Sequence, residues 1–136
     1  MADYSDMRSR LKTRLETIAG LRAYAVVPDK PETPAAIIRP LRMDYQQSMG
    51  AGGANKVPFE IILLTPLSSS NERSQAVLDA YLDNSGTYSL KAAIEGDKTL
   101  GGTVDTLHVS GWRDYGVIEW VGVTYLGARV DVEVWD

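Results

Sequence analysis

The apolar run at residues 57–67, VPFEIILLTPL, constrains the fold more than any other stretch of this chain. Because strand side chains alternate between two faces, one face would carry Val57, Phe59, Ile61 and Leu63. The opposite face is apolar as well, through Ile62 and Leu64. Pro58 and Pro66 bracket the run too closely for a full helix. A strand that is apolar on both faces needs cover on both, so the pattern predicts a central strand of a sheet.

The composition indicates one globular domain over residues 1–136, with 44% hydrophobic and 24% charged residues. A net charge of -4 argues against a general nucleic-acid binder, which would usually be basic. The absence of cysteine excludes disulfides, zinc–thiolate sites and cysteine nucleophiles. The sequence shows neither an apolar run long enough to span a bilayer nor a secretion signal. We therefore expect a soluble protein made in the cytoplasm.

Helical periodicity occurs in three segments. Residues 5–18 place their apolar side chains on one helical face, Met7, Leu11, Leu15 and Ile18, and Gly20 is a suitable stop. Ser69 and Glu72 have the spacing of a capping box, which predicts the start of a second helix that runs to residue 82. Its side chains predicted to face the sheet are Val77, Leu78, Tyr81 and Leu82. A third is predicted over 89–95, before Gly96.

The remaining periodic segments alternate as strands do. Residues 21–27 and 35–39 are best paired as an antiparallel hairpin, or placed at an edge of the sheet. Later strands are predicted at 103–112, 115–120, 123–125 and 128–134, with a turn at Val121-Gly122 and a bulge at Gly127. Together these elements predict an α+β domain, in which helices pack on one face of a mostly antiparallel sheet.

A glycine-rich stretch at residues 41–56 precedes the central strand, and we expect it to form a mobile loop. Two interpretations stay open: a loop that becomes ordered on a partner, or a two-stranded excursion with a mobile tip. A phosphate-binding loop is disfavoured, because the stretch lacks a Gly-Lys-Ser/Thr ending and precedes a strand instead of following one.

No residue pattern in the sequence indicates a catalytic site. His108 is the sole histidine and is expected to be structural or exposed, and no Gly-x-Ser-x-Gly elbow occurs. Asp79 and Asp83 have the spacing to share a cation, although a solvated acidic helix face explains them more simply. The C-terminal strands are rich in aromatic residues that suit an interface or a core: Trp112, Tyr115, Trp120, Tyr125 and Trp135. We predict no enzymatic activity, no cofactor and no metal.

Short segments spread over nearly the whole chain carry a family resemblance. They are 18–24 (IAGLRAY), 27–29 (VPD), 44–50 (DYQQSMG) leading into Phe59, 78–82 (LDAYL), 85–86 (SG), 89–93 (SLKAA), 100–104 (LGGTV), 115–116 (YG) and 125–128 (YLGA). In this order they resemble the tail terminator proteins of long-tailed bacteriophages, in the form common among phages of actinobacteria.

The resemblance implies an α+β subunit of a homohexameric ring. Such a ring is a structural virion protein of the tail and neck, made in the host cytoplasm. It caps the tail tube, ends tail polymerisation and joins the tail to the head–tail connector, or stopper, protein. Genome DNA passes through the lumen without specific binding, and no membrane, cofactor or catalytic residue is involved.

Combining the resemblance with the residue pattern gives candidate contact positions. For the subunit or tube interface they are Arg42, Asp44, Tyr45, Met49, Asn55, Lys56 and Trp135. Some of Asp44, Asp105, Asp131 and Glu133 are expected to face the lumen, since an acidic surface does not grip phosphates. Two alternatives stay open: a head-completion or connector ring protein of the neck, and a small-ligand-binding or enzyme domain using a cleft around His108 and Trp112.

Overall fold

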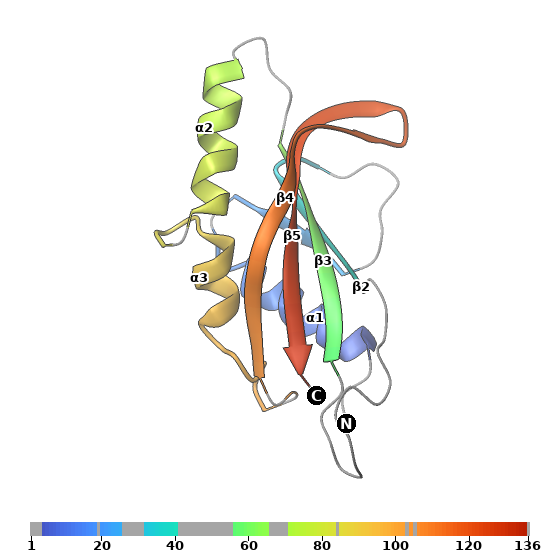
Figure 1. Ribbon diagram of the computed structural model, residues 1–136, viewed down its shortest axis with the longest axis vertical. Helices are drawn as coiled ribbons and strands as arrows, with labels where there is room; N and C mark the ends of the chain where they lie inside the picture. The colour runs from blue at the N-terminus through green and yellow to red at the C-terminus, as the bar shows by residue number, and fades with distance from the viewer. Residues whose placement is uncertain are drawn as a thin grey trace.

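The computed structural model describes residues 4–18, 20–25, 32–40, 56–65, 71–83, 85–102, 104 and 106–135. Within them, five strands form one mixed sheet in the order β1-β2-β3-β5-β4 (Figure 1). The strands are β1 (Arg22–Tyr24), β2 (Ala35–Pro40), β3 (Lys56–Thr65), β4 (Thr106–Trp120) and β5 (Val123–Trp135). The helices are α1 (Tyr4–Leu15), α2 (Asn71–Leu82) and α3 (Leu90–Glu95). The predicted α+β class with a mostly antiparallel sheet is confirmed.

The central position of β3 is confirmed. It pairs antiparallel with β2 on one side and with β5 on the other. Every residue from Val57 to Thr65 is buried, as a strand covered on both faces requires. The apolar run therefore determines which strand lies in the middle of the sheet.

The first two strands pair differently from the favoured expectation. β1 lies at the edge of the sheet, as one interpretation held, but it runs parallel to β2, so the antiparallel hairpin is wrong. The chain between them, residues 25–34, is longer than the turn of a tight antiparallel hairpin. It is therefore long enough to lead back to the end of the sheet at which β1 begins, so that β2 can run parallel to β1. Tyr24 lies opposite Ile37 in this register.

All three helices pack on one face of the sheet. Their buried side chains join the odd-numbered residues of β3 in the main core: Met7, Leu11 and Leu15 from α1, Leu78 and Tyr81 from α2, Leu90 and Ile94 from α3. Val77 is an exception to the expected pattern, because it points away from the sheet and is exposed. Helix α1 ends at Leu15, earlier than predicted, and a turn then carries the chain to buried Ile18 and to Gly20 at φ 81°.

The C-terminal region is built from two long strands instead of four short ones. β4 and β5 are joined at Val121-Gly122, as predicted, and extend past the rest of the sheet (Figure 1). The irregularity expected at Gly127 lies beside it, because one register shift falls between Arg113 and Gly116, the partner of Gly127, but the extra residue is on β4 and not on β5. Gly127 is required for another reason: a Cβ atom there would lie 2.1 Å from the carbonyl oxygen of Leu63.

The glycine at position 127 allows the hairpin to bend over the sheet face that carries no helix. Gly127 lies opposite Gly116, which has φ 151°, next to one of the register shifts. Beyond this bend a second, smaller core forms from Ile37, Ile62, Leu64 and Ile118, flanked by Tyr24, Trp120 and Tyr125. The second face of β3 is thus covered in part by the chain's own hairpin.

Candidate functional site

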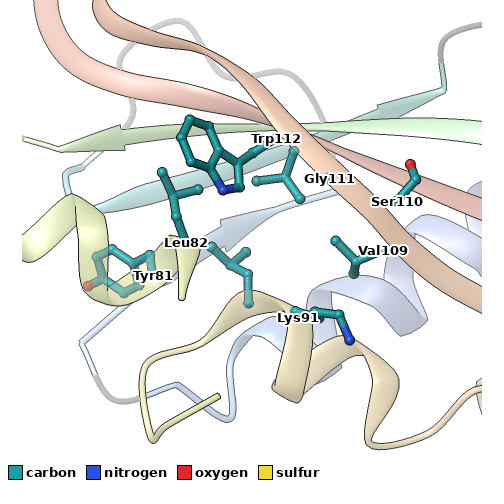
Figure 2. Close-up of a pocket in the computed structure, with 9 residues that line it drawn as sticks. Tyr81, Leu82, Lys91, Val109, Ser110, Gly111 and Trp112 are labelled. Atoms are coloured by element: carbon teal, nitrogen blue, oxygen red, sulfur yellow. The ribbon is translucent and has the colours of Figure 1, made fainter. Parts of the chain in front are cut away.

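A cleft lies between helices α2 and α3 and the outer strand β4 (Figure 2). It has a volume of about 190 Å³ and is lined mainly by apolar side chains. Its walls come from Tyr81, Leu82, Leu90, Lys91, Val109, Ser110, Gly111, Trp112 and Val130. Because the space is several times the ~30 Å³ that one water occupies in the liquid, an aliphatic side chain fits into it.

The outer wall of this cleft is aromatic. Trp112 leaves 51% of its surface exposed, and its ring lies 5.8 Å from that of Tyr115. The Tyr115 hydroxyl donates a 2.8 Å hydrogen bond to Asp79 on α2, which fixes the helix against the strand. Burial raises the pKa of Tyr115, and the hydrogen bond to the Asp79 carboxylate adds to this, giving a pKa of about 12.

Glu95, at the end of α3, links this helix to the strand beside the cleft. Its carboxylate accepts a 3.0 Å hydrogen bond from the backbone N–H of Val109 and a 2.7 Å ion pair from Lys91. Burial raises the pKa of Glu95, but the contacts with Lys91 and Val109 outweigh that effect and hold the pKa below 4.5. Ser89 caps α3 by accepting a hydrogen bond from the Ala92 N–H. The hydrogen bond between Val109 and Glu95 therefore holds α3 against the edge strand β4.

A second feature is a charged cluster on the sheet face that carries no helix. Its centre is Glu60 of β3, whose side chain is only 2% exposed. Arg39, Arg113 and Arg129 reach it from three strands, with nitrogen–oxygen distances of 2.6, 2.8 and 3.1 Å. Asp131, on β5, pairs with Arg113 at 3.2 Å. The cluster thus ties together β2, β3, β5 and β4.

The electrostatics of Glu60 follow from this arrangement. Burial raises its pKa, whereas the hydrogen bonds and charges of the three arginines lower it by more. The net result is a pKa of Glu60 below its ordinary value of 4.5, so the carboxylate is charged at neutral pH. Asp114 also pairs with Arg113 and Arg129, so three carboxylates match the three arginines and the cluster has no surplus charge with which to bind an anion.

A third feature is the exposed tip of the β4–β5 hairpin. Val117 and Val121 are each 66% exposed, and Val123 is also exposed. Val121 has φ 50° and Gly122 φ 80°, which is the geometry of a type I′ turn. A β-branched residue rarely adopts a positive φ, and Asn or Asp is the usual choice at this position. The chain therefore presents valine at this tip against its own conformational preference.

The structure does not bring His108 into the cleft that Trp112 lines. His108 Nε2 lies 2.7 Å from Glu133 and is not among the residues that line the cleft. Trp112 lines the cleft beside Val130, which belongs to the main core under the helices. Along β4, a register shift lies between His108 and Trp112. His108 is a partly exposed surface residue next to Glu133, as its isolation in the sequence predicts.

Most of the predicted contact residues lie outside the described part of the chain. This applies to Arg42, Asp44, Tyr45, Met49 and Asn55, to the rest of the stretch 41–55, and to Asp105 and Ser69. Lys56 and Trp135 are described, and their Cα atoms are partners at the end of the β3–β5 ladder. Of the expected lumen residues, Asp131 pairs with Arg113 and Glu133 with His108, so neither lies on a purely acidic surface.

The sequence contains a signal for the Glu60 cluster, although it is not part of any motif. Glu60 interrupts the most apolar run in the chain, and a charged residue in such a run needs partners if it is buried. The cleft had a weaker signal, because its walls combine a predicted helix face with a strand that is distant in sequence. For Val121 the sequence offers one weak signal: a valine stands at a hairpin-turn position where asparagine is favoured. The exposure of its side chain is seen only in the structure.

In the part of the chain that the structure describes, no group of three or more His, Asp or Glu side chains is placed to hold a metal ion. Asp79, expected as one half of a possible cation pair, is instead the acceptor for Tyr115. Among the described helices, none has the length and apolar character needed to cross a membrane.

A comparison of the sequence with protein-family models and with curated proteins finds no match.

Proposed function

We propose that this protein is a structural subunit of a ring that ends the tail tube of a long-tailed bacteriophage and joins it to the head connector. The link to phage tails comes from the sequence resemblance, which spans nearly the whole chain. In this proposal the subunits bind each other, the tail tube protein and the connector, and DNA passes through the ring. The ring is hexameric, a virion component of the tail and neck, and has no enzymatic role.

The observation that supports an assembly subunit is the exposed apolar surface of the outer strand and its hairpin. Trp112, Val117, Val121 and Val123 are all exposed on a domain of 14.9 kDa. We take Trp112 at the cleft and the valines near the hairpin turn as two candidate interaction surfaces, because exposed apolar side chains mark such sites when they occur together. Catalysis would need a poised nucleophile or acid–base pair at the cleft, whereas Lys91, the charged residue among those that line it, is paired with Glu95.

The charge of the chain is compatible with a DNA passage. With a net charge of -4, the subunit has no excess of basic residues to hold the phosphate backbone. On the sheet face that carries no helix, the arginines around Glu60 are paired with Glu60, Asp131 and Asp114. We expect no measurable binding of double-stranded DNA even at low salt. Tight retention of DNA would contradict the proposed passage.

The test of the proposed function is the solution mass by light scattering over a concentration series, with and without tail tube protein. A species of about 90 kDa, six times the subunit mass of 14.9 kDa, is expected, and it should grow with concentration. Added during tube polymerisation, the protein should stop tube growth and remain at the tube end. Binding to isolated connectors but not to tubes would instead favour a head-completion protein, and a persistent monomer that ignores the tube would refute the ring.

A further inference from the structure

We infer that the end of the β4–β5 hairpin, residues 117–125, is a hinged strap that closes over the smaller apolar core and can lift from it as a unit. Lifting would uncover the strip of β2 and β3 formed by Ile37, Ile62 and Leu64. The inference goes beyond the proposed function and does not depend on it, because it concerns a movement within one subunit.

The strap is joined to the sheet along a short boundary. The pairing of β5 with β3 ends at Leu126, which lies opposite Thr65. The Thr65 hydroxyl donates a 2.7 Å hydrogen bond to the Leu126 carbonyl oxygen, so this pair is the last fixed point of β5 before the strap. Within the strap, β4 and β5 pair with each other and with no other strand that the structure describes (Figure 1). A two-stranded ribbon of this kind has little stability of its own in water.

Few side chains hold the strap against the domain. Ile118 is 8% exposed and completes the smaller core, and Trp120 and Tyr125 are partly buried against that core. The other residues of the strap are exposed: Val117, Glu119, Val121, Gly122, Val123 and Thr124. A segment with few buried apolar contacts opens locally at a lower free energy than the core of its domain.

The pivot lies at Gly116, where β4 bends. Its φ of 151° is one that residues with a side chain rarely adopt, and a register shift lies between it and Arg113. Apart from the chain neighbours, no atom lies within 4 Å of the place where a Cβ would stand, so side-chain packing does not lock the backbone here. On β5, the close approach of Gly127 to the Leu63 carbonyl oxygen keeps the base of the strap in place. The backbone of β4 can therefore rotate at the bend.

The closed position depends mainly on Ile118. One buried isoleucine and two partly buried aromatic rings make the closed form the major state. A minor conformation a few kcal/mol above the major one is populated at about 0.1–10%. In this open state the apolar strip on β2 and β3 becomes accessible. The strap is thus a device that keeps the strip covered and can release it for a contact.

Cysteine labelling tests the movement directly, because the chain has no cysteine of its own. Leu64→Cys places a thiol under the strap. Leu63→Cys is the matched control, since this neighbour on β3 is equally buried but belongs to the main core under the helices. With a small maleimide and no denaturant, we expect Leu64→Cys to react at least about tenfold faster than Leu63→Cys. Equal rates would show that both sites open only with the whole domain, and the strap would be wrong.

The pivot is tested by adding Gly116→Ala to each of the two cysteine variants. Alanine is strained at φ 151°, so the bent, closed form should lose population and the labelling of Leu64→Cys should accelerate at least about fivefold. Gly111→Ala is the control on the same strand, because it also meets open space but has no left-handed backbone, and it should leave the rate unchanged. If Gly116→Ala accelerated the labelling of Leu63→Cys to the same extent, the change would act on the whole domain and the hinge would be overturned.

A second measurement leaves the core intact, in case a cysteine in the core prevents folding. Spin labels on Val121→Cys and Val77→Cys, both at exposed positions, report the distance between the strap and α2. When Gly116→Ala is added, we expect a second distance to appear beside the one that dominates without it. A single, unchanged distance in both proteins would overturn the hinge, whatever the labelling rates show.

Discussion

The Glu60 cluster allows a prediction whose size can be worked out from the structure. Glu60→Gln keeps the shape of the side chain but removes its charge, leaving Arg39, Arg113 and Arg129 around a neutral amide. Hydrogen bonds to charged groups contribute about 1.5–3 kcal/mol each, which sets an upper limit of several kcal/mol for three of them. The actual loss should be smaller, because these arginine side chains are 26–42% exposed and water can solvate them.

Two further effects reduce the loss. Arg113 keeps its partners Asp131 and Asp114 in the variant, and Arg129 keeps Asp114. Glutamine also avoids part of the cost of burying a charge. We therefore expect Glu60→Gln to lower the free energy of unfolding by about 2–3 kcal/mol, corresponding to a fall in Tm on the order of 10 °C. Urea unfolding at neutral pH, followed by circular dichroism, measures this change.

The pH dependence provides a second readout of the same variant. The folded state holds the pKa of Glu60 below its ordinary value of 4.5, so its contribution is present above that pH and is lost as the pH falls through the folded-state pKa. The wild type should therefore lose more stability than Glu60→Gln as the pH drops below 4.5. Glu119→Gln, the same change at an exposed site, should stay within about 0.5 kcal/mol of wild type. If Glu60→Gln unfolded at the wild-type urea concentration, the reasoning would be refuted, and the cluster would be a set of pairs screened by solvent.

Two other predictions concern the bend and the helix–strand contact. Gly127→Ala should destabilise the fold by at least about 2 kcal/mol in urea unfolding, because the new methyl group would meet the Leu63 carbonyl at 2.1 Å. Gly111→Ala is its control, since nothing lies within 4 Å of a Cβ there, and equal effects of the two changes would contradict the close approach. Burial and the hydrogen bond to Asp79 raise the folded-state pKa of Tyr115 from 10.0 to about 12, so the stability that neutral Tyr115 contributes is present below pH 10 and lost toward pH 12. Tyr115→Phe should lower Tm at neutral pH and flatten the alkaline decline, and an unchanged alkaline decline would show that Tyr115 is not its cause.

The sequence determined the elements whose side chains form unambiguous periodic patterns. The apolar run through Phe59 identified the central strand, because a strand with apolar side chains on both faces is stable where both faces are covered, as in the middle of a sheet. The spacing of Met7, Leu11 and Leu15 fixed the buried face of α1. The short apolar pattern before Gly96 located α3, although Ser89, placed inside the predicted helix, is the N-cap of that helix in the structure. Each of these signals is local, so a single stretch of chain contains all the information needed.

Tertiary structure decided the features that depend on residues distant in sequence. The direction of β1 relative to β2 depends on how the intervening chain returns, which no alternation pattern encodes. Gly127 suggested a bulge from its neighbours alone, whereas its real constraint is the Leu63 carbonyl on another strand. The cluster around Glu60 draws on four strands, and the cleft on two helices and the edge strand β4. Charge pairing and open apolar surface arise only when the strands are placed side by side, so the candidate contact surfaces became visible only in three dimensions.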